Sequence, residues 1–422
     1  MKKCTDRSDG REILTGVLCW IVYFSIYPGR LNFSAGMSEM LETGCWEKGQ
    51  LGSVAAAFYL AYGIGQYPSG LLGDRISPKW MIGAGVCGSA LINALFPAAG
   101  TIMWMQGLWF LNGLFQALVW PPMVRLVTGM TSAERSVKVI LFLSLSSPAG
   151  MLCTYLVNAL LLGRGNWRAG FFLAGIWLAG VTVLWFLSLS WLERRMERQG
   201  GEIRKCMVRY KAERTTTGSA VMPHAAVSSG LVCLTAAAFI HGILKDGLTT
   251  WIPACLTVKF AIQPSFSVLL TMVLPVVNLC GIPAAQTVNR RFFQNEAATG
   301  AFCYLLSVGC FLCMLGGGGN SLYGTVVIFA IVTSMMTAVN TLLVSLVPLH
   351  FGKVGRVATV SGILNAVTYL GSAAASVLFG YTMEYAGWRE TQLIWCVCAA
   401  AGGLCCACAA GNWKRNRENM DG

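Results

Sequence analysis

The sequence predicts an all-α membrane protein whose twelve transmembrane helices form two six-helix pseudo-repeats. Three observations support this fold class. Hydrophobic residues make up 55% of the 422 residues and charged residues only 12%. Twelve apolar stretches are each long enough to cross a bilayer, which takes roughly 20 residues. Charged and aromatic residues of the first half also recur in the second half at fixed spacings.

The twelve predicted spans follow one another along nearly the whole chain. They occupy 12–40, 50–73, 79–99, 104–128, 136–163, 168–192, 228–257, 264–288, 296–316, 321–349, 356–384 and 388–411. The intervening segment 193–227 is rich in charged residues and predicts a basic cytoplasmic linker. We therefore expect an N-terminal bundle over 12–192, a C-terminal bundle over 228–411, and cytoplasmic tails over 1–11 and 412–422.

The basic residues are unevenly distributed around these spans. If the N-terminus is cytoplasmic, 24 of the 31 Lys and Arg residues lie on the cytoplasmic side, five lie outside and two lie within spans. This is the positive-inside pattern of a multi-pass protein of the inner or plasma membrane, with both termini in the cytoplasm. The pattern accounts for the formal charge of +13 without a nucleic-acid partner. We expect the spans to be embedded in the lipid bilayer.

Catalytic, metal and cofactor sites are not expected. No nucleophile, base and orienting residue are grouped in any turn, which argues against an enzyme. The 17 cysteines fall mostly within spans, where a thiol packs as a small hydrophobic group. Cys310 with Cys313, and the cluster of Cys405, Cys406 and Cys408, lack the His or carboxylate companions of a metal site. We predict no metal and no cofactor.

Two sets of residue pairs predict an internal duplication. Arg30 and Lys245 are 215 residues apart, as are Arg75 and Arg290. Later in each half the spacing is 221, and it joins Arg135 with Arg356, Gly150 with Gly371, Trp167 with Trp388, and Arg168 with Arg389. An insertion of six residues explains the change of spacing. Parallel six-span repeats about an axis along the membrane normal are the architecture of the major facilitator fold.

Arg30 and Lys245 are the principal candidates for ligand binding. A cation at membrane depth costs at least about 2.5 kcal/mol and usually marks a pathway or a ligand site. Equivalent cations in two repeats predict one small anion held between the halves, since Arg donates bidentately to oxyanions and Lys acts as a point charge. Tyr23, Tyr27 and Arg30 recur at steps of four and three. They form a ligand-facing stripe, or an interface packing stripe if Arg30 snorkels from a helix end.

Asp246 and His241 each leave two interpretations open. Asp246 is the one acidic residue deep in a span. It either neutralises Lys245 or lies on another helix face, because residues i and i+1 do not share a face. His241 precedes Lys245 by one turn and is either a donor or proton carrier beneath the ammonium, or a neutral packing residue. The scarcity of buried carboxylates favours anion exchange over proton coupling.

Several motifs resemble the organophosphate:phosphate antiporter family of the major facilitator superfamily. The resemblance spans roughly 23–411, and its segments are Arg30-Leu-Asn-Phe-Ser, Ala61-Tyr62-Gly63 with Gly73-Asp74-Arg75, Phe115-Gln116 with Trp120-Pro121-Pro122 and Arg125, Lys245-Asp246-Gly247 with Trp251 and Pro253, and Gly380-Tyr381-Thr382 with Gly387-Trp388. The Gly-Asp-Arg turn alone occurs throughout the superfamily. The Trp-Pro-Pro motif together with the two cations is more specific.

The resemblance implies a site that differs from other members in charge. Arg30 and Lys245 would bind the phosphoryl group, with Lys245 in place of the family's arginine. Gln66 and Ser146 stand where other members have a lysine and a histidine, so the site is less positive and favours a smaller or weaker anion. Cavity lining, or packing, is expected of Tyr27, Tyr62, Trp120, Asn340 and Asn365. The expected gating residues are Gly73, Asp74, Arg75, Arg135, Arg290 and Arg356.

These observations predict a secondary transporter of a small organic anion, with organophosphates among the candidates and inorganic phosphate as a candidate counter-substrate. Two uncompensated cations would repel in the empty carrier, so a bound anion would favour closure of the halves. Two alternatives stay open. One is a proton-coupled symporter of hexuronate-like acids, which usually carries an acidic residue where Gly29 stands. The other is a transporter-like membrane sensor that binds the anion without moving it.

Overall fold

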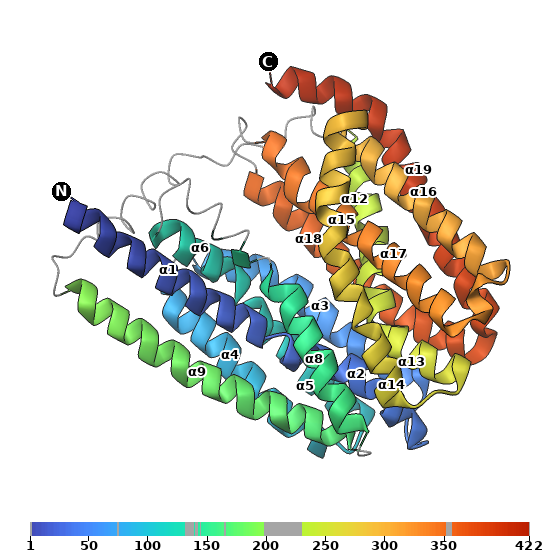
Figure 1. Ribbon diagram of the computed structural model, residues 1–422, viewed down its shortest axis with the longest axis horizontal. Helices are drawn as coiled ribbons and strands as arrows, with labels where there is room; N and C mark the ends of the chain where they lie inside the picture. The colour runs from blue at the N-terminus through green and yellow to red at the C-terminus, as the bar shows by residue number, and fades with distance from the viewer. Residues whose placement is uncertain are drawn as a thin grey trace.

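The protein is helical throughout the part that the structure describes. The computed structural model describes residues 2–73, 76–130, 139, 142–143, 145–163, 166–197, 230–351 and 357–421. The first group of helices comprises α1 (Lys2–Ser25), α2 (Pro28–Glu42), α3 (Lys48–Gly73), α4 (Pro78–Leu95), the 3₁₀ turn η1 (Phe96–Ala98), α5 (Ile102–Ala117), α6 (Trp120–Met130), α8 (Ser146–Leu162) and α9 (Trp167–Glu197) (Figure 1).

The second group begins after the predicted linker, most of which lies outside the described residues. It comprises α12 (Leu231–Gly242), η2 (Ile243–Gly247), α13 (Leu248–Phe260), α14 (Pro264–Thr271), α15 (Val273–Val288), η3 (Asn289–Phe293), α16 (Glu296–Leu315), η4 (Gly318–Asn320), α17 (Leu322–Asn340), η5 (Thr341–Leu346), η6 (Val347–Phe351), α18 (Val357–Tyr381), η7 (Thr382–Ala386) and α19 (Trp388–Asp421). Among these, η2, η3, η5 and η7 are wider π-helical turns inserted in or after α-helices.

The number and order of the helices agree with the predicted spans. Ten helical segments of the described chain are long and apolar enough to cross a membrane. The two remaining spans correspond to α3, which has 26 residues, and to α8, which has 17. The predicted span 136–163 that contains α8 begins among residues outside the described ranges. The predicted all-α membrane fold is therefore confirmed.

Two helix limits differ from the predicted spans. Helix α1 already begins at Lys2 and α19 continues to Asp421, so helical backbone extends beyond the apolar stretches at both ends. The first span is also broken, because α1 ends at Ser25 and α2 begins at Pro28. Hydropathy sets where a helix crosses the bilayer and not where its backbone hydrogen bonds end. Proline is favoured at a first helical position, which suits a new helix beginning there.

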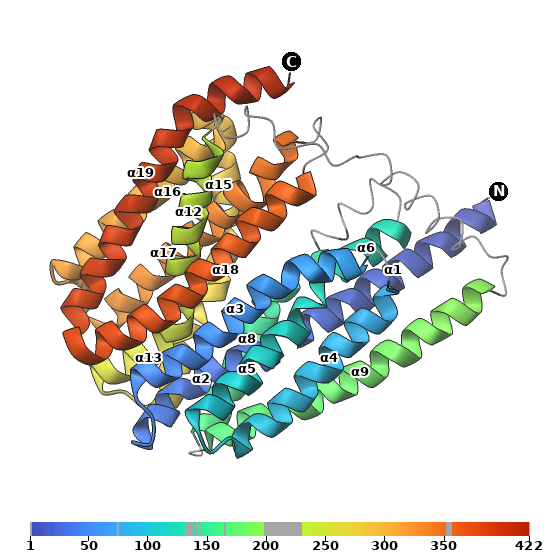
Figure 2. The same cartoon turned by 180° about the vertical axis from the view of Figure 1, so that it is seen from behind.

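The two groups of helices lie side by side and differ in direction. In Figures 1 and 2 they approach one another around α2, α13 and α14 and diverge toward the end where both chain termini lie. We refer to the end opposite the termini as the distal end. The distal end is closed in this structure by contacts between the two groups.

Helices α3 and α18 form the long contact between the groups. A side-chain carbon at Gly52 would lie 2.3 Å from the backbone oxygen of Ser376, so only glycine permits this approach. Near the same end the Lys48 ammonium donates to the Met383 carbonyl at 3.2 Å, and the Gly49 amide donates to the Glu384 carboxylate at 2.8 Å. Small residues at helix interfaces are the usual route to close packing in lipid.

The predicted duplication is visible in equivalent helix contacts. A carbon added to Gly150 of α8 would lie 2.6 Å from the carbonyl oxygen of Phe24 in α1. A carbon added to Gly371 of α18 would lie 2.0 Å from the carbonyl oxygen of Phe239 in α12. Phe24 and Phe239 are 215 residues apart, whereas the two glycines are 221 apart. The same helix crossing is thus built twice, with both of the spacings found in the sequence.

Candidate functional site

Arg30 lies inside the membrane-spanning part of the first span. The span runs from Ile13 to Glu42, and Arg30 follows directly after the break at Pro28. The amides of Arg30 and Leu31 both donate to the Tyr27 carbonyl, at 3.0 and 2.9 Å, which fixes the start of α2. Arg30 lies near a helix end, as expected, because it is the third residue of α2. Its side chain does not snorkel to a surface, since the span continues for twelve residues to Glu42 and Nε donates to Gln116 inside the bundle.

A buried amide network holds the backbone next to Arg30. The carbonyl oxygen of Gly29 accepts from Asn93 at 3.2 Å, Asn112 at 2.8 Å and Gln116 at 3.2 Å. Gln116 also uses its own carbonyl oxygen to accept from Arg30 Nε at 3.1 Å. All three amide side chains are fully buried, and they come from α4 and α5. A satisfied buried network is rigid, so the guanidinium is held in one orientation.

Aromatic rings surround the guanidinium. Its central carbon lies 4.4 Å from the ring centre of Tyr62, 5.2 Å from Phe58 and 5.6 Å from Tyr27. The Tyr62 ring in turn meets Tyr369 of α18 edge to face, at 4.7 Å between ring centres. Cation–π contacts stabilise the charge without using its N–H donors. Arg30 therefore lies where the two groups of helices meet.

One terminal nitrogen of Arg30 remains without a hydrogen-bond partner among the described residues, although it is buried. A buried donor without a hydrogen-bond partner raises the free energy of the folded protein, and a charged donor raises it more. The arrangement can accept an oxyanion, because an oriented guanidinium with unused N–H groups donates strongly to carboxylate or phosphate oxygens. It is an arrangement suited to binding.

Lys245 is placed differently, in the π-helical turn η2. Its ammonium lies 3.4 Å from a carboxylate oxygen of Asp246, and the two side chains are 29% and 16% exposed. The other Asp246 oxygen accepts from the Ser372 hydroxyl at 2.9 Å. Both residues belong to the π turn, which departs from the α-helical geometry on which the rule for neighbouring residues rests. Asp246 thus pairs with Lys245, which was one of the two interpretations left open by the sequence, and the expectation of two uncompensated cations does not hold for Lys245.

His241 lies fully buried on α12 and contacts α17. Its Nε2 is 3.1 Å from the side-chain oxygen of Asn340, whereas its Nδ1 has no hydrogen-bond partner among the described residues. His241 and Asn340 are therefore brought together, as two candidates that the sequence selected separately. The π turn begins at Ile243, between His241 and Lys245, so the simple one-turn relation between these two residues does not apply.

A layer of hydrogen bonds closes the region between this site and the distal end. The Ser34 hydroxyl donates to the Thr250 carbonyl at 2.6 Å, and the Tyr59 and Thr250 hydroxyls are 2.9 Å apart. These contacts join α2 and α3 to α13. They would have to break for the distal end to open.

Comparison with known proteins now defines the family. The model of the Major Facilitator Superfamily matches residues 19–376. The chain belongs to the Major Facilitator Superfamily. The resemblance found in the motifs is confirmed at this level, and the curated relatives include organophosphate transporters.

The curated relatives of this superfamily member have two kinds of names. This chain is 31% identical to the "Membrane sensor protein UhpC" of Escherichia coli over 180 residues, which is 42% of this chain and 40% of the sensor. It is 23% identical to the glycerol-3-phosphate transporter of Bacillus subtilis over 393 residues, which is 90% of this chain and 87% of that protein. The match to the sensor thus spans about two fifths of the sensor's length.

Solved structures of other superfamily transporters share the fold at low sequence identity. A bacterial homolog of the human lysosomal transporter Spinster, in an inward-facing and occupied conformation, aligns with a TM-score of 0.71 at 13% identity and covers 96% of this chain and 95% of that one. A D-xylose-proton symporter aligns with a TM-score of 0.67 at 12% identity, covering 93% and 95%. These likenesses concern the fold alone.

The remaining predicted site residues differ in burial and in the helices that carry them. Trp120 is half-buried, with its ring 4.6 Å from that of Tyr23 on α1. Ser146 is fully buried and donates to the Leu143 carbonyl at 2.5 Å, so its hydroxyl is used locally. Gln66 and Asn365 are half-buried on α3 and α18, the two helices that contact each other across the halves.

The predicted gating residues lie mostly beyond the described part of the chain. Gly73 is the last residue of α3, and Arg290 is exposed in η3. The others, Asp74, Arg75, Arg135 and Arg356, lie outside the described residues. The gating role of these residues therefore stays a prediction.

The sequence analysis assigned no site role to several residues that the structure places at the site. These are Gln116, Phe58, Tyr59, Tyr369 and Ser372. Gln116 carried a usable signal, because an amide inside an apolar span is costly unless it has a partner. Phe58 and Tyr62 are four residues apart and share a helix face. The contacts of Tyr369 and Ser372 depend on tertiary packing and left no sequence signal.

Proposed function

We propose that this protein is a secondary transporter that moves a small organic anion, with phosphorylated compounds as the favoured class. The observation that carries the proposal is Arg30: an oriented guanidinium, one terminal nitrogen of which is buried and has no hydrogen-bond partner among the described residues. The relatives named as glycerol-3-phosphate and hexose phosphate transporters support the phosphorylated class. The anion would complete the hydrogen bonding of Arg30.

Lys245 would supply the second contact by changing partner. In this structure it is paired with Asp246 at 3.4 Å. An anion arriving between the halves would compete with that carboxylate for the ammonium, while the Ser372 hydroxyl continues to bind Asp246. The bound anion would thereby link α2 of one half to η2 of the other, and this differential contact could favour one conformation over another.

Transport would follow from rocking of the two halves, 12–192 and 228–411, around this site. The structure is closed at the distal end, where Ser34 and Tyr59 bond to Thr250. We propose that the termini lie in the cytoplasm, so that the distal end faces outside. Cys45 is exposed near the distal end and should then react with an impermeant thiol reagent added to intact cells. Reaction only after permeabilisation would reverse the proposed orientation.

We favour anion exchange as the mode of transport, with inorganic phosphate as the proposed counter-substrate. An empty carrier would move Arg30 with an unsatisfied buried donor, whereas a loaded one would move it paired, so the loaded carrier should reorient faster. The substrate is first selected by thermal shift of the purified protein against phosphate, sugar phosphates and carboxylates. Phosphate-loaded liposomes should then take up the labelled anion far faster than empty ones.

The rival mode is proton symport, for which His241 and Asp246 are the titratable candidates. Its sign would be accumulation in unloaded liposomes that follows an inward proton gradient. Loss of that accumulation in Asp246→Asn or His241→Ala would establish the rival. Exchange instead predicts that a pH gradient matters little.

A membrane sensor is the second candidate function, because relatives from two bacteria carry that name. A sensor of this kind would bind the anion without moving it. Thermal stabilisation by the anion combined with no flux in any loading condition would support the sensor and overturn the transporter.

Sharing of one anion by Arg30 and Lys245 is tested by a double-mutant cycle. Neutralising either residue should greatly weaken binding while the protein still inserts and folds. If both touch one ligand, the double variant should lose less than the sum of the single variants. Fully additive losses would show that the two cations act independently.

A further inference from the structure

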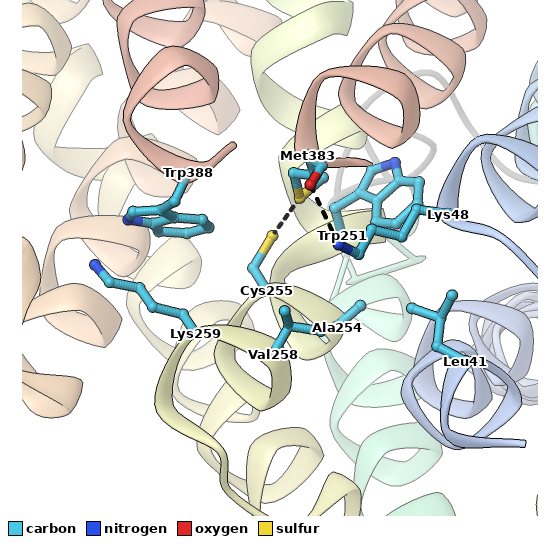
Figure 3. Close-up of a pocket in the computed structure, with 9 residues that line it drawn as sticks. All are labelled: Leu41, Lys48, Trp251, Ala254, Cys255, Val258, Lys259, Met383 and Trp388. Carbon is cyan, nitrogen blue, oxygen red and sulfur yellow. Dashed lines mark hydrogen bonds between the residues drawn. The ribbon is translucent and has the colours of Figure 1, made fainter. Parts of the chain in front are cut away.

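A second cavity lies at the distal end, apart from Arg30. Its volume is about 310 Å³, within the lower range of small-molecule sites. Figure 3 shows the residues that line it, with Lys48 on one side, Lys259 and Trp388 on the other, and Cys255, Met383 and Trp251 between them. The cavity is thus walled by both halves of the protein, because Lys48 begins α3 while the others belong to α13, η7 and α19.

Both lysines line this cavity, and their partners in the described part of the chain are neutral. The Lys48 ammonium donates to the Met383 carbonyl at 3.2 Å. The Lys259 ammonium donates to the Gly319 carbonyl and lies 4.5 Å from the ring centre of Trp388. An ammonium has three N–H donors, so each lysine keeps donors for a further ligand.

Acidic groups nearby do not neutralise these cations. Within the described ranges of the chain, neither lysine has a carboxylate within ion-pair distance. Glu384 is close in sequence to Met383, but its carboxylate accepts from the Gly49 amide at 2.8 Å. The indole nitrogen of Trp388 is buried and has no hydrogen-bond partner among the described residues. The cavity therefore lies between two lysines that have no carboxylate partner among the described residues, which suits an anion.

We propose that this cavity is a second anion-binding site, for a small oxyanion such as inorganic phosphate or the phosphate group of a larger molecule. Lysine ammonium groups bind phosphate as point charges without a demanding geometry. A doubly charged oxyanion would match two ammonium groups in charge. The proposal concerns binding and does not depend on whether the protein transports, exchanges or senses.

The distal site is separate from the central one. Lys259 follows Lys245 by fourteen residues on the same span, which is about 20 Å at 1.5 Å per residue. The Ser34 and Tyr59 contacts with Thr250 close the region between them. Since Lys48 and Lys259 belong to different halves, opening of the distal end would separate them. An anion at this site consequently favours the conformation with a closed distal end.

The test places a reporter thiol in the cavity. Val258 lines it and is 55% exposed, so Val258→Cys should fold normally. We expect Cys at 258 to react about ten times faster with an anionic than with a cationic methanethiosulfonate reagent, since clustered charge concentrates counter-ions. Rates are measured by peptide mass spectrometry on purified protein. Exposed Cys45, also toward the distal end, serves as the internal reference.

Phosphate protection identifies the ligand and its site. Inorganic phosphate should slow labelling at 258 and not at Cys45, and Lys48→Gln or Lys259→Gln should abolish both the protection and the preference for the anionic reagent. Lys79→Gln, which breaks the ion pair with Glu193 elsewhere, is the matched control and should change neither. Equal rates for the two reagents, or no protection by phosphate, would overturn the proposal.

Arg30→Gln separates the distal site from the central one. If protection at 258 persists in this variant, the anion occupies the distal cavity. If protection disappears in Arg30→Gln and survives in both lysine variants, the effect arises at the central site and the proposal is wrong. Repeating the assay in nanodiscs of neutral and of anionic lipid distinguishes free phosphate from a lipid headgroup, because a bound headgroup would protect without added phosphate.

Discussion

The two halves of this protein place a cation at equivalent positions and then treat it in opposite ways. Arg30 follows a proline-initiated helix start, with its Nε bound by Gln116 and three rings around it. Lys245 lies in a π turn and is bound to its own neighbour, Asp246. Arg30 is oriented by a buried network and has no carboxylate within ion-pair distance among the described residues, whereas Lys245 is paired with Asp246.

This difference suggests a division of roles within a duplicated framework. A fixed guanidinium selects the ligand by geometry, because little conformational freedom is lost on binding. A lysine on a flexible stem, held by an ion pair of modest strength, can respond to the ligand. The N-terminal half would thus provide recognition, and the C-terminal half would provide the contact that changes.

The largest effect is expected from removal of the Arg30 cation. Arg30→Gln should weaken binding of the best anion of the thermal-shift panel about 100-fold, because truncating a buried charged donor typically costs 2–5 kcal/mol. Titration calorimetry on purified protein measures this. Arg168→Gln is the matched control, since Arg168 also lies over an aromatic ring, at 4.6 Å from Trp167, but outside the site. Similar losses in both variants would remove Arg30 from the site.

Charge-preserving exchanges sharpen the comparison between the halves. Arg30→Lys should weaken binding about 30-fold, because a lysine loses the Nε bond to Gln116 and the bidentate fork. Lys245→Arg should change the affinity by no more than about threefold, since this position needs a positive charge but no fixed orientation of its N–H donors. Calorimetry of the two variants side by side is the measurement. Equal losses would show that both positions recognise the ligand by geometry.

The amide network should matter less than the charge that it orients. Gln116→Leu keeps Arg30 but removes the Nε acceptor and one donor to the Gly29 carbonyl. We expect about tenfold weaker binding, since hydrogen bonds to charged groups contribute roughly 1.5 kcal/mol or more. The matched control is Gln106→Leu on the same helix, where Gln106 bonds Ser53 away from the site. An unchanged affinity in Gln116→Leu would show that the rings alone orient the guanidinium.

The sequence determines the fold of this protein more completely than its site. The spans could be predicted because lipid burial requires long apolar stretches, and the duplication because residues recur at spacings of 215 and 221. Arg30 and Lys245 could be selected because charge at membrane depth is costly. Each of these signals depends on the residue types along the chain, so each can be recognised without knowing which helices contact one another.

The contacts that give the site its chemistry were harder to foresee. The neighbours Lys245 and Asp246 form their ion pair within a π turn that the sequence did not predict. The break before Pro28 and the convergence of three amides on the Gly29 carbonyl depend on how α2, α4 and α5 cross. Such features follow from tertiary packing, and no periodicity in the sequence encodes them.

The smallest effect is expected at the carboxylate that compensates Lys245. Asp246→Asn removes the competitor of the anion for the ammonium while the Ser372 hydroxyl can still bind the amide oxygen. Partly exposed ion pairs contribute about 0.2–1 kcal/mol. We therefore expect anion binding to become about threefold tighter. Calorimetry gives the affinity, and exchange into phosphate-loaded liposomes gives the accompanying rate.

The direction of this small change decides between interpretations of the pair. Tighter binding with slower exchange means that Asp246 opposes the anion and helps to release it, because a ligand held more firmly in one state leaves that state more slowly. Asp246→Ala is a second variant that removes the hydrogen bond to Ser372 as well, and it should bind no more tightly than Asp246→Asn. Weaker binding in both variants would show instead that the ion pair positions Lys245 for the ligand. The contrast between an oriented cation in one half and an exchangeable one in the other would then fail, since both would be held in place by fixed partners.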